Sequence, residues 1–448
     1  MKSLPKFVLV LFFTSLNLSR STCTEWHAIF DPNRTMIEID ASEDVHLTLS
    51  NLLDETIDSI NRNYAIRTLN EKVAVVENPD DIEFVNVAGE SHSWEAHFRV
   101  RGVFLGTTRF FVVRIVDGVD IEQSDEFIDV IVLRPERVLD TLFAVVVVLL
   151  LAILFINFGA AIDLEIMKNI FKRPIGPAIG TVCQLVFVPL ISYGLGALFF
   201  PNDPELALGL FLTGVSPAGG ASNIWTLLCG GNINLSISMT TISTMASFGT
   251  IPLWLFLLGR SIFDRANLGV PYVQVTLVAI SLLIPLAIGL LIQKFLPKIT
   301  KFLVKITEKL SLVFLIIIVI FGIFTNLYMM PLFAWQIVGA GLGLPLLGNI
   351  VGLSAAAIFR QPKEDCIAIS IEIAVQNTAL TLFLLTFSLE PPAADISMII
   401  PIAVSILTPL PMIIFIVIKK TRECLKRRKS NKKAMNLIEF GKVADESK

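Results

Sequence analysis

Long apolar runs dominate the chain beyond residue 139, whereas the stretch before it mixes short apolar and polar segments. Nine apolar runs follow one another with short linkers, at 139–160, 176–199, 206–228, 233–258, 272–292, 310–328, 337–358, 366–388 and 396–418. About 20 apolar residues in a helix are enough to cross the hydrocarbon core of a bilayer. The pattern therefore predicts a polytopic α-helical membrane protein with nine transmembrane helices within 139–418.

Two of these runs are interrupted by polar and small residues. The third run contains the segment SPAGGASN at 216–223, and the eighth contains Glu372, Gln376 and Asn377. Proline and glycine weaken a helix, and backbone released at membrane depth is tolerated only where protein or a cavity satisfies it. A broken helix in each half of the chain is typical of an inverted-repeat transporter with a midplane binding site. A proline kink or close packing through small residues would each explain a single break.

Glu372 is the one acidic residue that lies inside an apolar run and not near its end. Gln376 follows four residues later and therefore shares its helical face. A charge at membrane depth is costly and usually faces a partner or a functional cavity. We expect Glu372 to belong to a cation site, and the alternative is a structural carboxylate bonded to a neighbouring helix.

Other apolar runs carry neutral side chains with oxygen atoms that could join this acid in one site. Ser236, Thr240 and Ser243 follow a helical spacing in the fourth run, and Gln184 lies in the middle of the second run. Neutral oxygens around one carboxylate suit a monovalent cation, whereas calcium and magnesium sites recruit more carboxylates.

The amino-terminal segment predicts export followed by a folded domain. Residues 1–23 have basic residues, a short apolar core and small polar residues, which is the layout of a signal peptide, with an uncleaved anchor as the alternative. Residues 24–136 contain alternating stretches at 45–50 and 97–101, a strand–turn–strand pattern at 104–111 and a last strand at 127–133. Short strands at this spacing predict a small β-sandwich that is extracellular or lumenal.

Basic residues are concentrated in alternate loops and in the tail 419–448. This bias places those loops and the carboxyl terminus in the cytoplasm and the amino terminus outside. In that topology the sequon that begins at Asn33 is a glycosylation site. We expect a multi-pass protein of the plasma membrane, with an internal secretory-pathway membrane as the alternative.

Composition supports the membrane assignment and narrows the chemistry. The chain is 54% hydrophobic with a mean hydropathy of +0.72, which excludes an ordinary soluble globular protein. Its five cysteines form no CxxC pair, so a structural zinc site is not expected. Nothing in the charge pattern indicates nucleic acid as a partner, so the expected partners are the lipid bilayer and a small solute.

Three segments resemble the signatures of the bile acid:sodium symporter family. They read PAGGASN at 217–223, GNINLSISMTTIST at 231–244 and EIAVQN at 372–377. A folded domain before the spans is similar to that of the less-studied members with an amino-terminal extension. The resemblance implies two broken helices that cross near the midplane of a core domain, beside a panel domain, with an organic anion bound between the two domains.

The resemblance also implies residue roles. One sodium ion is expected at Ser222, Asn223, Ser236, Thr240 and Glu372. A second sodium ion is expected at Gln184, Glu372, Gln376 and the carbonyls of Ile373 and Val375. Pro217 and Asn377 are expected beside the substrate. The implied activity is sodium-coupled symport of a bile acid or steroid-conjugate-like anion, with Na⁺ as coupling ion and no cofactor.

Two positions depart from the family pattern, because Ala218 and Ala374 stand where members usually have glycine. The alternatives are a non-transporting protein on this scaffold with an adhesion or sorting ectodomain, and a proton-coupled carrier that uses Glu372. An enzyme is not expected, because the stretch around Ser216 lacks the final glycine of G-x-S-x-G and no histidine lies in the apolar runs.

Overall fold

The computed structural model describes residues 26–52, 56–79, 82–86, 92–135, 137–162, 174–266, 269–325 and 335–422. The chain divides into two compact units, with the boundary between Pro135 and Glu136. The predicted signal peptide, the loop lysines at 163–173 and tail residues 423–448 lie outside the described residues.

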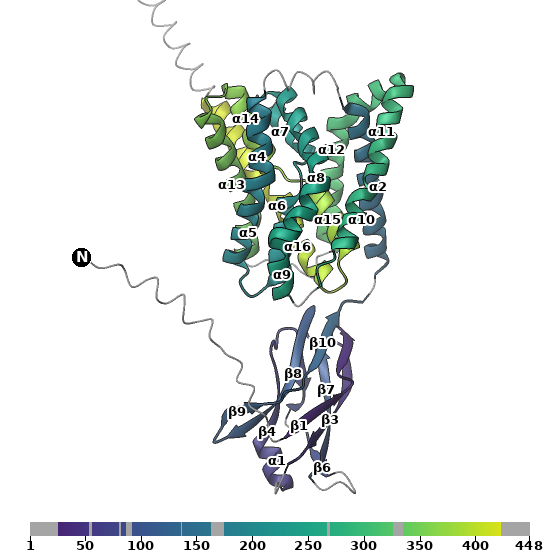
Figure 1. Ribbon diagram of the computed structural model, residues 1–448, viewed down its shortest axis with the longest axis vertical. Coiled ribbons are helices and arrows are strands. Elements are labelled where there is room, and N and C mark those ends of the chain that lie inside the picture. The colour runs from purple at the N-terminus through teal and green to yellow at the C-terminus, as the bar shows by residue number, and fades with distance from the viewer. Residues whose placement is uncertain are drawn as a thin grey trace, which may run out of the picture. The chain divides into compact units, whose positions relative to one another are not determined.

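The amino-terminal unit consists of two five-stranded sheets (Figure 1). The first sheet has the order β1 (His27–Asp31), β3 (Ser42–Ser50), β7 (Trp94–Gly102) and β5 (Ala74–Glu77), with β6 (Phe84–Asn86) also paired to β7. The second has the order β2 (Arg34–Glu38), β10 (Ile128–Leu133), β8 (Gly106–Val116) and β4 (Tyr64–Thr68), with β9 (Val119–Gln123) paired to β8. The strands pair antiparallel except for β2 and β10, which are parallel. A short helix, α1 (Ile57–Asn63), precedes β4.

One apolar core lies between these sheets. Strand β7 alternates strictly between buried and exposed residues, as expected for a strand with one face on a core. Its inward residue Phe98 belongs to the same buried cluster as Leu47 on β3 and Phe110 and Val130 on the second sheet. The predicted β-rich domain of two packed sheets is therefore confirmed.

The predicted strand–turn–strand at 104–111 is wrong. Strand β8 begins at Gly106 and continues unbroken to Val116, and the chain reverses before it, where the amides of Val103 and Phe104 bond to the carbonyl of Val73. A Cβ on Gly106 would lie 2.8 Å from a methyl of Val73. This glycine therefore permits a close approach and does not mark the turn.

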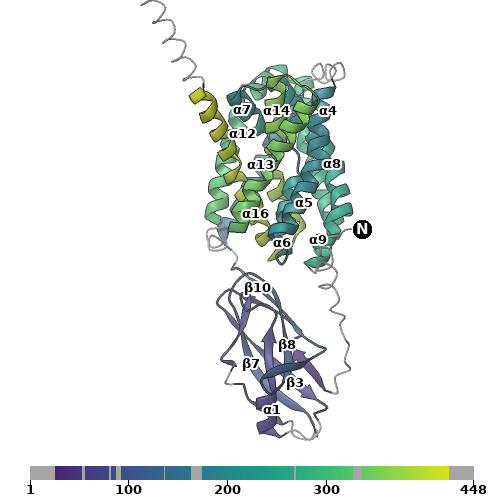
Figure 2. The ribbon, with the colours of Figure 1, turned by 90° about the vertical axis from the view of Figure 1, so that its left-hand side faces the viewer.

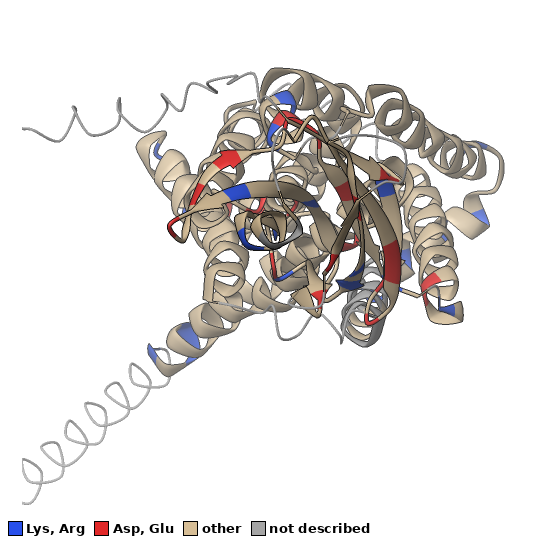
Figure 3. Cartoon of the chain, turned by 90° about the horizontal axis from the view of Figure 1, so that it is seen from below, with Lys and Arg blue, Asp and Glu red and all other residues tan. Residues whose placement is uncertain are grey.

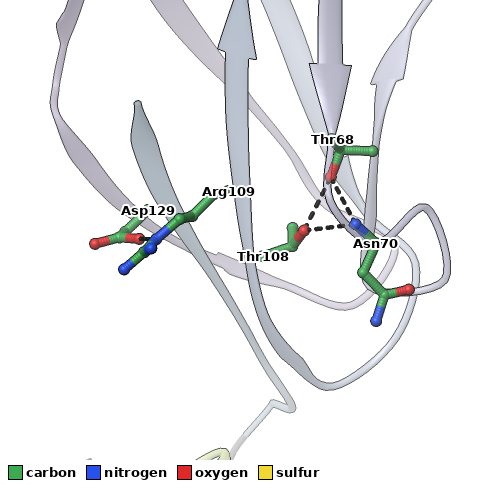
Figure 4. A network of polar contacts seen from close by, with 5 residues as sticks. All are labelled: Thr68, Asn70, Thr108, Arg109 and Asp129. Carbon is green, nitrogen blue, oxygen red and sulfur yellow. Dashed lines mark hydrogen bonds and ion pairs between the residues drawn. The ribbon is translucent and has the colours of Figure 1, made fainter. Parts of the chain in front are cut away.

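Polar side chains tie the connection after β4 to β8 (Figure 4). The hydroxyls of Thr68 and Thr108 lie 2.9 Å apart, and the backbone amide of Asn70 donates to Thr108 at 3.0 Å. On the same strand, Arg109 donates to Asp129 of β10 at 2.9 Å. These contacts join β4, β8 and β10 at one end of the second sheet.

The second unit is helical. Its elements are α2 (Val138–Ala161), α4 (Ile175–Val182), a π-helical turn (Cys183–Phe187), α5 (Val188–Phe199), α6 (Pro204–Val215), α7 (Ala221–Cys229), α8 (Ile233–Trp254), a second π-helical turn (Leu255–Gly259), α9 (Arg260–Arg265), α10 (Tyr272–Ser281), α11 (Leu283–Phe295), α12 (Pro297–Thr325), α13 (Trp335–Ile358), α14 (Lys363–Ala374), α15 (Thr378–Ser388) and α16 (Ala393–Leu407). Six helical segments of the described chain are long and apolar enough to cross a membrane. The other three predicted runs fall on α6–α7, α12 and α14–α15. The prediction of a helical multi-pass membrane protein is confirmed, and the count of nine spans stays a prediction.

Helix packing in this unit depends on small residues at close contacts. Helix α2 packs against α11 and α12, and a Cβ on Gly159 of α2 would lie 2.2 Å from the carbonyl oxygen of Leu286 on α11. Helices α13 and α14 are neighbours, as are α6 and α16. Helices α7 and α14 lie at the same end of the unit in both side views (Figures 1 and 2). Most of the helical ribbon is free of charged residues, whereas several strands of the β-rich unit carry Lys, Arg, Asp or Glu (Figure 3).

Candidate functional site

The two broken runs cross each other at their breaks. Helix α6 ends at Val215 and α7 begins at Ala221, while α14 ends at Ala374 and α15 begins at Thr378. The connecting segments form an antiparallel bridge between Ala218 and Gln376. The amide of Gly219 donates to the carbonyl of Val375 at 2.8 Å, and the amide of Asn377 donates to that of Pro217 at 2.9 Å. Each broken helix thus satisfies backbone groups that the other exposes.

Side chains reinforce the crossing on either side of this bridge. The buried hydroxyls of Ser216 and Thr381 lie 2.8 Å apart and link the end of α6 to α15. The side-chain oxygen of Asn377 accepts from the amide of Leu380 at 3.1 Å and caps the start of α15. A polar residue at a helix N-cap satisfies one of the free amides of the first turn.

Glu372 lies two residues before Ala374, the last residue of α14, and is 1% exposed. Its carboxylate accepts hydrogen bonds from three hydroxyls: Ser222 at 2.8 Å and Ser236 at 2.7 Å on one oxygen, and Thr240 on the other. Ser236 also lies 2.9 Å from the side-chain oxygen of Asn223. The five residues expected around the first sodium ion therefore come together from α7, α8 and α14.

The residues expected around the second ion form a separate chain of contacts. The Gln184 amide nitrogen donates to the side-chain oxygen of Gln376 at 2.7 Å, and Gln376 in turn donates to the carbonyl of Ile373 at 2.6 Å. Glu372 makes no hydrogen bond to either glutamine within the described chain. The carbonyls of Ile373 and Val375 each already accept one hydrogen bond.

One acceptor of this second group is left without a donor. The side-chain oxygen of Gln184 has no hydrogen-bond partner among the described residues, although Gln184 is only 3% exposed. An unpaired buried acceptor is costly, and a native structure usually has a reason for it. A cation bound beside Gln184 would give this oxygen a partner.

The charge balance of the site favours a cation. Glu372 forms no ion pair with a Lys, Arg or His in the described part of the chain, so hydroxyls are its polar partners. The described residues also contain no group of three or more His, Cys, Asp and Glu side chains placed to hold a metal ion. The arrangement is one buried carboxylate among neutral oxygens, which matches the donor set expected from the sequence.

Pro217 and Asn377, expected beside the substrate, are both buried in the crossing, where their backbone groups bond to each other. Sequence reasoning missed the Ser216–Thr381 contact, because nothing in the spacing pairs two residues 165 positions apart. It also missed Trp254, whose indole nitrogen donates to the carbonyl of Leu185 at 2.7 Å.

Known proteins are similar to part of the chain. The sequence model of the Sodium Bile acid symporter family matches residues 148–330. The P3 protein of Homo sapiens is 33% identical over 261 residues, which are 58% of this chain and 54% of that protein, so the match spans about half of the P3 protein. The sodium-dependent organic anion transporter of Bos taurus is 33% identical over 56% of this chain and 67% of that transporter. The ileal sodium/bile acid cotransporter of Cricetulus griseus is 28% identical over 60% of this chain and 77% of its own length.

The family model covers the segments 217–223 and 231–244 and ends before Glu372. The family model includes Gln184, Ser222, Asn223, Ser236 and Thr240. Together with the crossed broken helices, this similarity identifies the chain as a member of the sodium bile acid symporter family.

Proposed function

We propose that this protein is a sodium-coupled symporter of an organic anion that works by alternating access. The observation that carries the proposal is the Glu372 carboxylate, buried where two broken helices cross and surrounded by hydroxyl and amide oxygens. The names of two relatives, a sodium-dependent organic anion transporter and an ileal sodium/bile acid cotransporter, support the same class of activity.

The first sodium ion binds at Glu372, Ser222, Asn223, Ser236 and Thr240. A hydroxyl is both a donor and an acceptor. Ser222, Ser236 and Thr240 therefore donate to the carboxylate when the ion is absent and coordinate the ion with their oxygens when it is present. Their protons have other acceptors within reach, since Ser236 lies 2.9 Å from the Asn223 oxygen and Thr240 lies 3.0 Å from the Ser236 carbonyl. Glu372 therefore has partners in both states: the hydroxyls when the ion is absent and the ion itself when it is bound.

The second ion binds at Gln184, Gln376, Glu372 and the carbonyls of Ile373 and Val375. Each of these carbonyls has two lone pairs and uses one in the crossing, so one remains for an ion. The unpartnered oxygen of Gln184 is the ligand that most directly supports this assignment.

We infer that sodium binding is coupled to anion transport because both ions bind where the two broken helices cross. Nine helices in two inverted repeats form a core domain that holds the crossing and a panel domain that includes α2, α11 and α12. Sodium stabilises the outward-facing state, a bile acid or steroid-conjugate-like anion binds between the domains, and inward rocking releases both. The protein lies in the plasma membrane with its amino terminus outside and its carboxyl terminus in the cytoplasm.

The two alanines in place of family glycines are compatible with this proposal. Neither Ala218 nor Ala374 has a positive φ, so neither position requires glycine for its backbone conformation. Both are fully buried, and Ala374 packs in an apolar cluster with Cys229 and Met412. A Cβ on Gly348 of α13 would lie 3.1 Å from the Cα of Ala374, so it is Gly348 that allows α13 to approach here.

Substitutions in the two ion sites test the proposal. Glu372→Gln keeps the shape of the side chain and removes the charge shared by both sites. Losing one charge-assisted contact costs about 1.5–3 kcal/mol. The sodium concentration for half-maximal effect should therefore rise roughly ten- to a hundredfold. Thr240→Ala should weaken only the first site and Gln184→Ala only the second, by about 1 kcal/mol each. The measurements are sodium-dependent thermal stabilisation and uptake across a sodium titration at fixed pH and ionic strength.

Choline replaces sodium in the control titrations, and bile acids and sulfated steroids are the substrates in the uptake series. An unchanged sodium response in well-folded Glu372→Gln would remove the carboxylate from the ion sites. A response to pH in place of sodium would assign Glu372 to a proton-coupled carrier. Sodium-dependent stabilisation without uptake of any anion would support a non-transporting protein on this scaffold.

A further inference from the structure

The helix that carries Gln184 is interrupted by a π-helical turn, Cys183–Phe187. In this turn the amide of Val188 bonds to the carbonyl of Cys183, five residues back in place of the usual four. The next residue is Pro189, which has no amide hydrogen. In an α-helix the carbonyl of Leu185 would accept from residue 189, so the sequence itself removes that donor.

Trp254 supplies an N–H to this carbonyl. Its indole nitrogen donates to the Leu185 oxygen at 2.7 Å across the contact between α8 and the π-helical turn. The contact is part-buried, and a backbone carbonyl that has lost its helical donor costs free energy where water has little access, so this bond stabilises the turn in its π form. Leu185 is the residue directly after Gln184, and fixing its peptide group fixes the backbone from which Gln184 projects.

The Gln184 side chain depends on that backbone. It donates to Gln376 at 2.7 Å and to the carbonyl of Ser216 at 2.9 Å, so it contacts both broken helices at once. A change in the twist of the π-helical turn would move these contacts together. The side chain that holds the turn therefore controls where the unpartnered Gln184 oxygen lies.

We propose that Trp254 is the positioning residue of the second cation site and acts through the π-helical turn on Gln184. The assignment rests on the proposed function, because the cation at Gln184 is part of it. Trp254 ends α8, the helix that also carries Ser236 and Thr240 of the first site. Helix α8 thus links the two sites: it contributes ligands to one and positions the ligand of the other.

A double-mutant cycle tests this role. Trp254→Phe keeps an aromatic ring and removes only the donor, so it should raise the sodium concentration for half-maximal stabilisation about fivefold, the effect of one hydrogen bond. In the Gln184→Ala background the same substitution should have no further effect, because the ligand it positions is gone. In the Thr240→Ala background the fivefold effect should remain. The full-length protein in lipid nanodiscs is titrated with sodium against choline at constant ionic strength.

Trp335→Phe is the matched control, since it makes the same chemical change at a tryptophan that is 71% exposed and should leave the titration unchanged. Hydrogen exchange of the peptide covering the π-helical turn adds a readout without sodium, and exchange should be faster in Trp254→Phe alone. Trp254→Tyr, which also lacks the indole donor, should repeat both results.

Three other results would contradict the positioning role of Trp254. If wild type responds to sodium and Trp254→Phe responds equally, or if its effect adds to that of Gln184→Ala, the positioning role is wrong while the proposed function stands. If Trp254→Phe and Trp254→Tyr both fail to fold, Trp254 is a structural residue and the proposal falls. If wild type itself shows no sodium response, the proposed function fails and this assignment falls with it.

Discussion

Gly219 is the residue on which the crossing of the broken helices depends most directly. Its amide bonds to Val375, and a Cβ at this position would lie 2.7 Å from the backbone oxygen of Gln376. The neighbouring Ala218 already carries a Cβ in the same bridge. Of the small residues in PAGGASN, Gly219 is therefore one that the backbone approach requires, whereas Ala218 shows that a methyl is accommodated at its own position.

Gly219→Ala should destabilise the protein by about 1–3 kcal/mol, because the added methyl would overpack backbone that cannot move without breaking the bridge. A lower midpoint of thermal unfolding in sodium-free nanodiscs is the measurement. Gly249→Ala on α8 is the control, since a Cβ there meets no atom within 4 Å. Equal midpoints for Gly219→Ala and wild type would show that the crossing is looser than the bridge geometry indicates.

Single residues explain which parts of the site could be read from the sequence. Glu372 was detectable because a lone carboxylate in an apolar run is costly, and Ser236 and Thr240 because their spacing places them on one helical face. The structure places all three in contact. Trp254 was not detectable, because its role depends on a carbonyl that Pro189 frees on another helix.

At the scale of elements, the half-helices are held by polar contacts as well as by backbone pairing. Ser216, directly after α6, and Thr381, in the first turn of α15, are both buried and lie close to the two breaks. Hydroxyl pairs between membrane helices contribute only about 0.6 kcal/mol on average. The pair adds modestly to stability, and its main effect is to fix where α6 meets α15.

Ser216→Ala and Thr381→Val should therefore show a coupling free energy of about 0.6 kcal/mol in a double-mutant cycle. The measurement is unfolding in a titration with sodium dodecyl sulfate. Ser238, which bonds to the carbonyl of Asn234 in its own helix, replaces Ser216 in the control cycle and should give no coupling to Thr381. Additive effects of Ser216→Ala and Thr381→Val would mean that the two hydroxyls do not stabilise each other.

The elements themselves were predicted unevenly. The alternation at 45–50 and 97–101 located β3 and β7, because one face of each strand packs on the core. The turn assigned within 104–111 was wrong, because Gly106 is required by contact with Val73, a tertiary cause that composition does not reveal. The same limit explains why the breaks at 216–223 and 372–377 were predicted from residue types, whereas only the resemblance implied that they cross. The bridge between Ala218 and Gln376 came from the structure.

At the scale of the whole molecule, the chain joins a β-rich unit to a membrane unit that contains every residue proposed for the two sodium sites. The exposed Lys298, Lys301 and Lys305 lie in the first turns of α12. They belong to one of the basic stretches between predicted spans, the one between 272–292 and 310–328. That bias and the predicted signal peptide favour the same topology by independent reasoning. In this topology the β-rich unit is outside the cell and accessible to glycosylation.

Asn33 should consequently carry an N-linked glycan in the mature protein. It is exposed between β1 and β2, and its backbone carbonyl accepts from the amide of Asp129 at 3.1 Å. Glycosidase treatment should increase the gel mobility of wild type to that of Asn33→Gln, while Arg34→Lys, which keeps the sequon, should behave as wild type. An epitope after Lys448 should be labelled by antibody only after permeabilisation. Labelling of that epitope in intact cells would reverse the topology and place the β-rich unit in the cytoplasm, where Asn33 could not be modified.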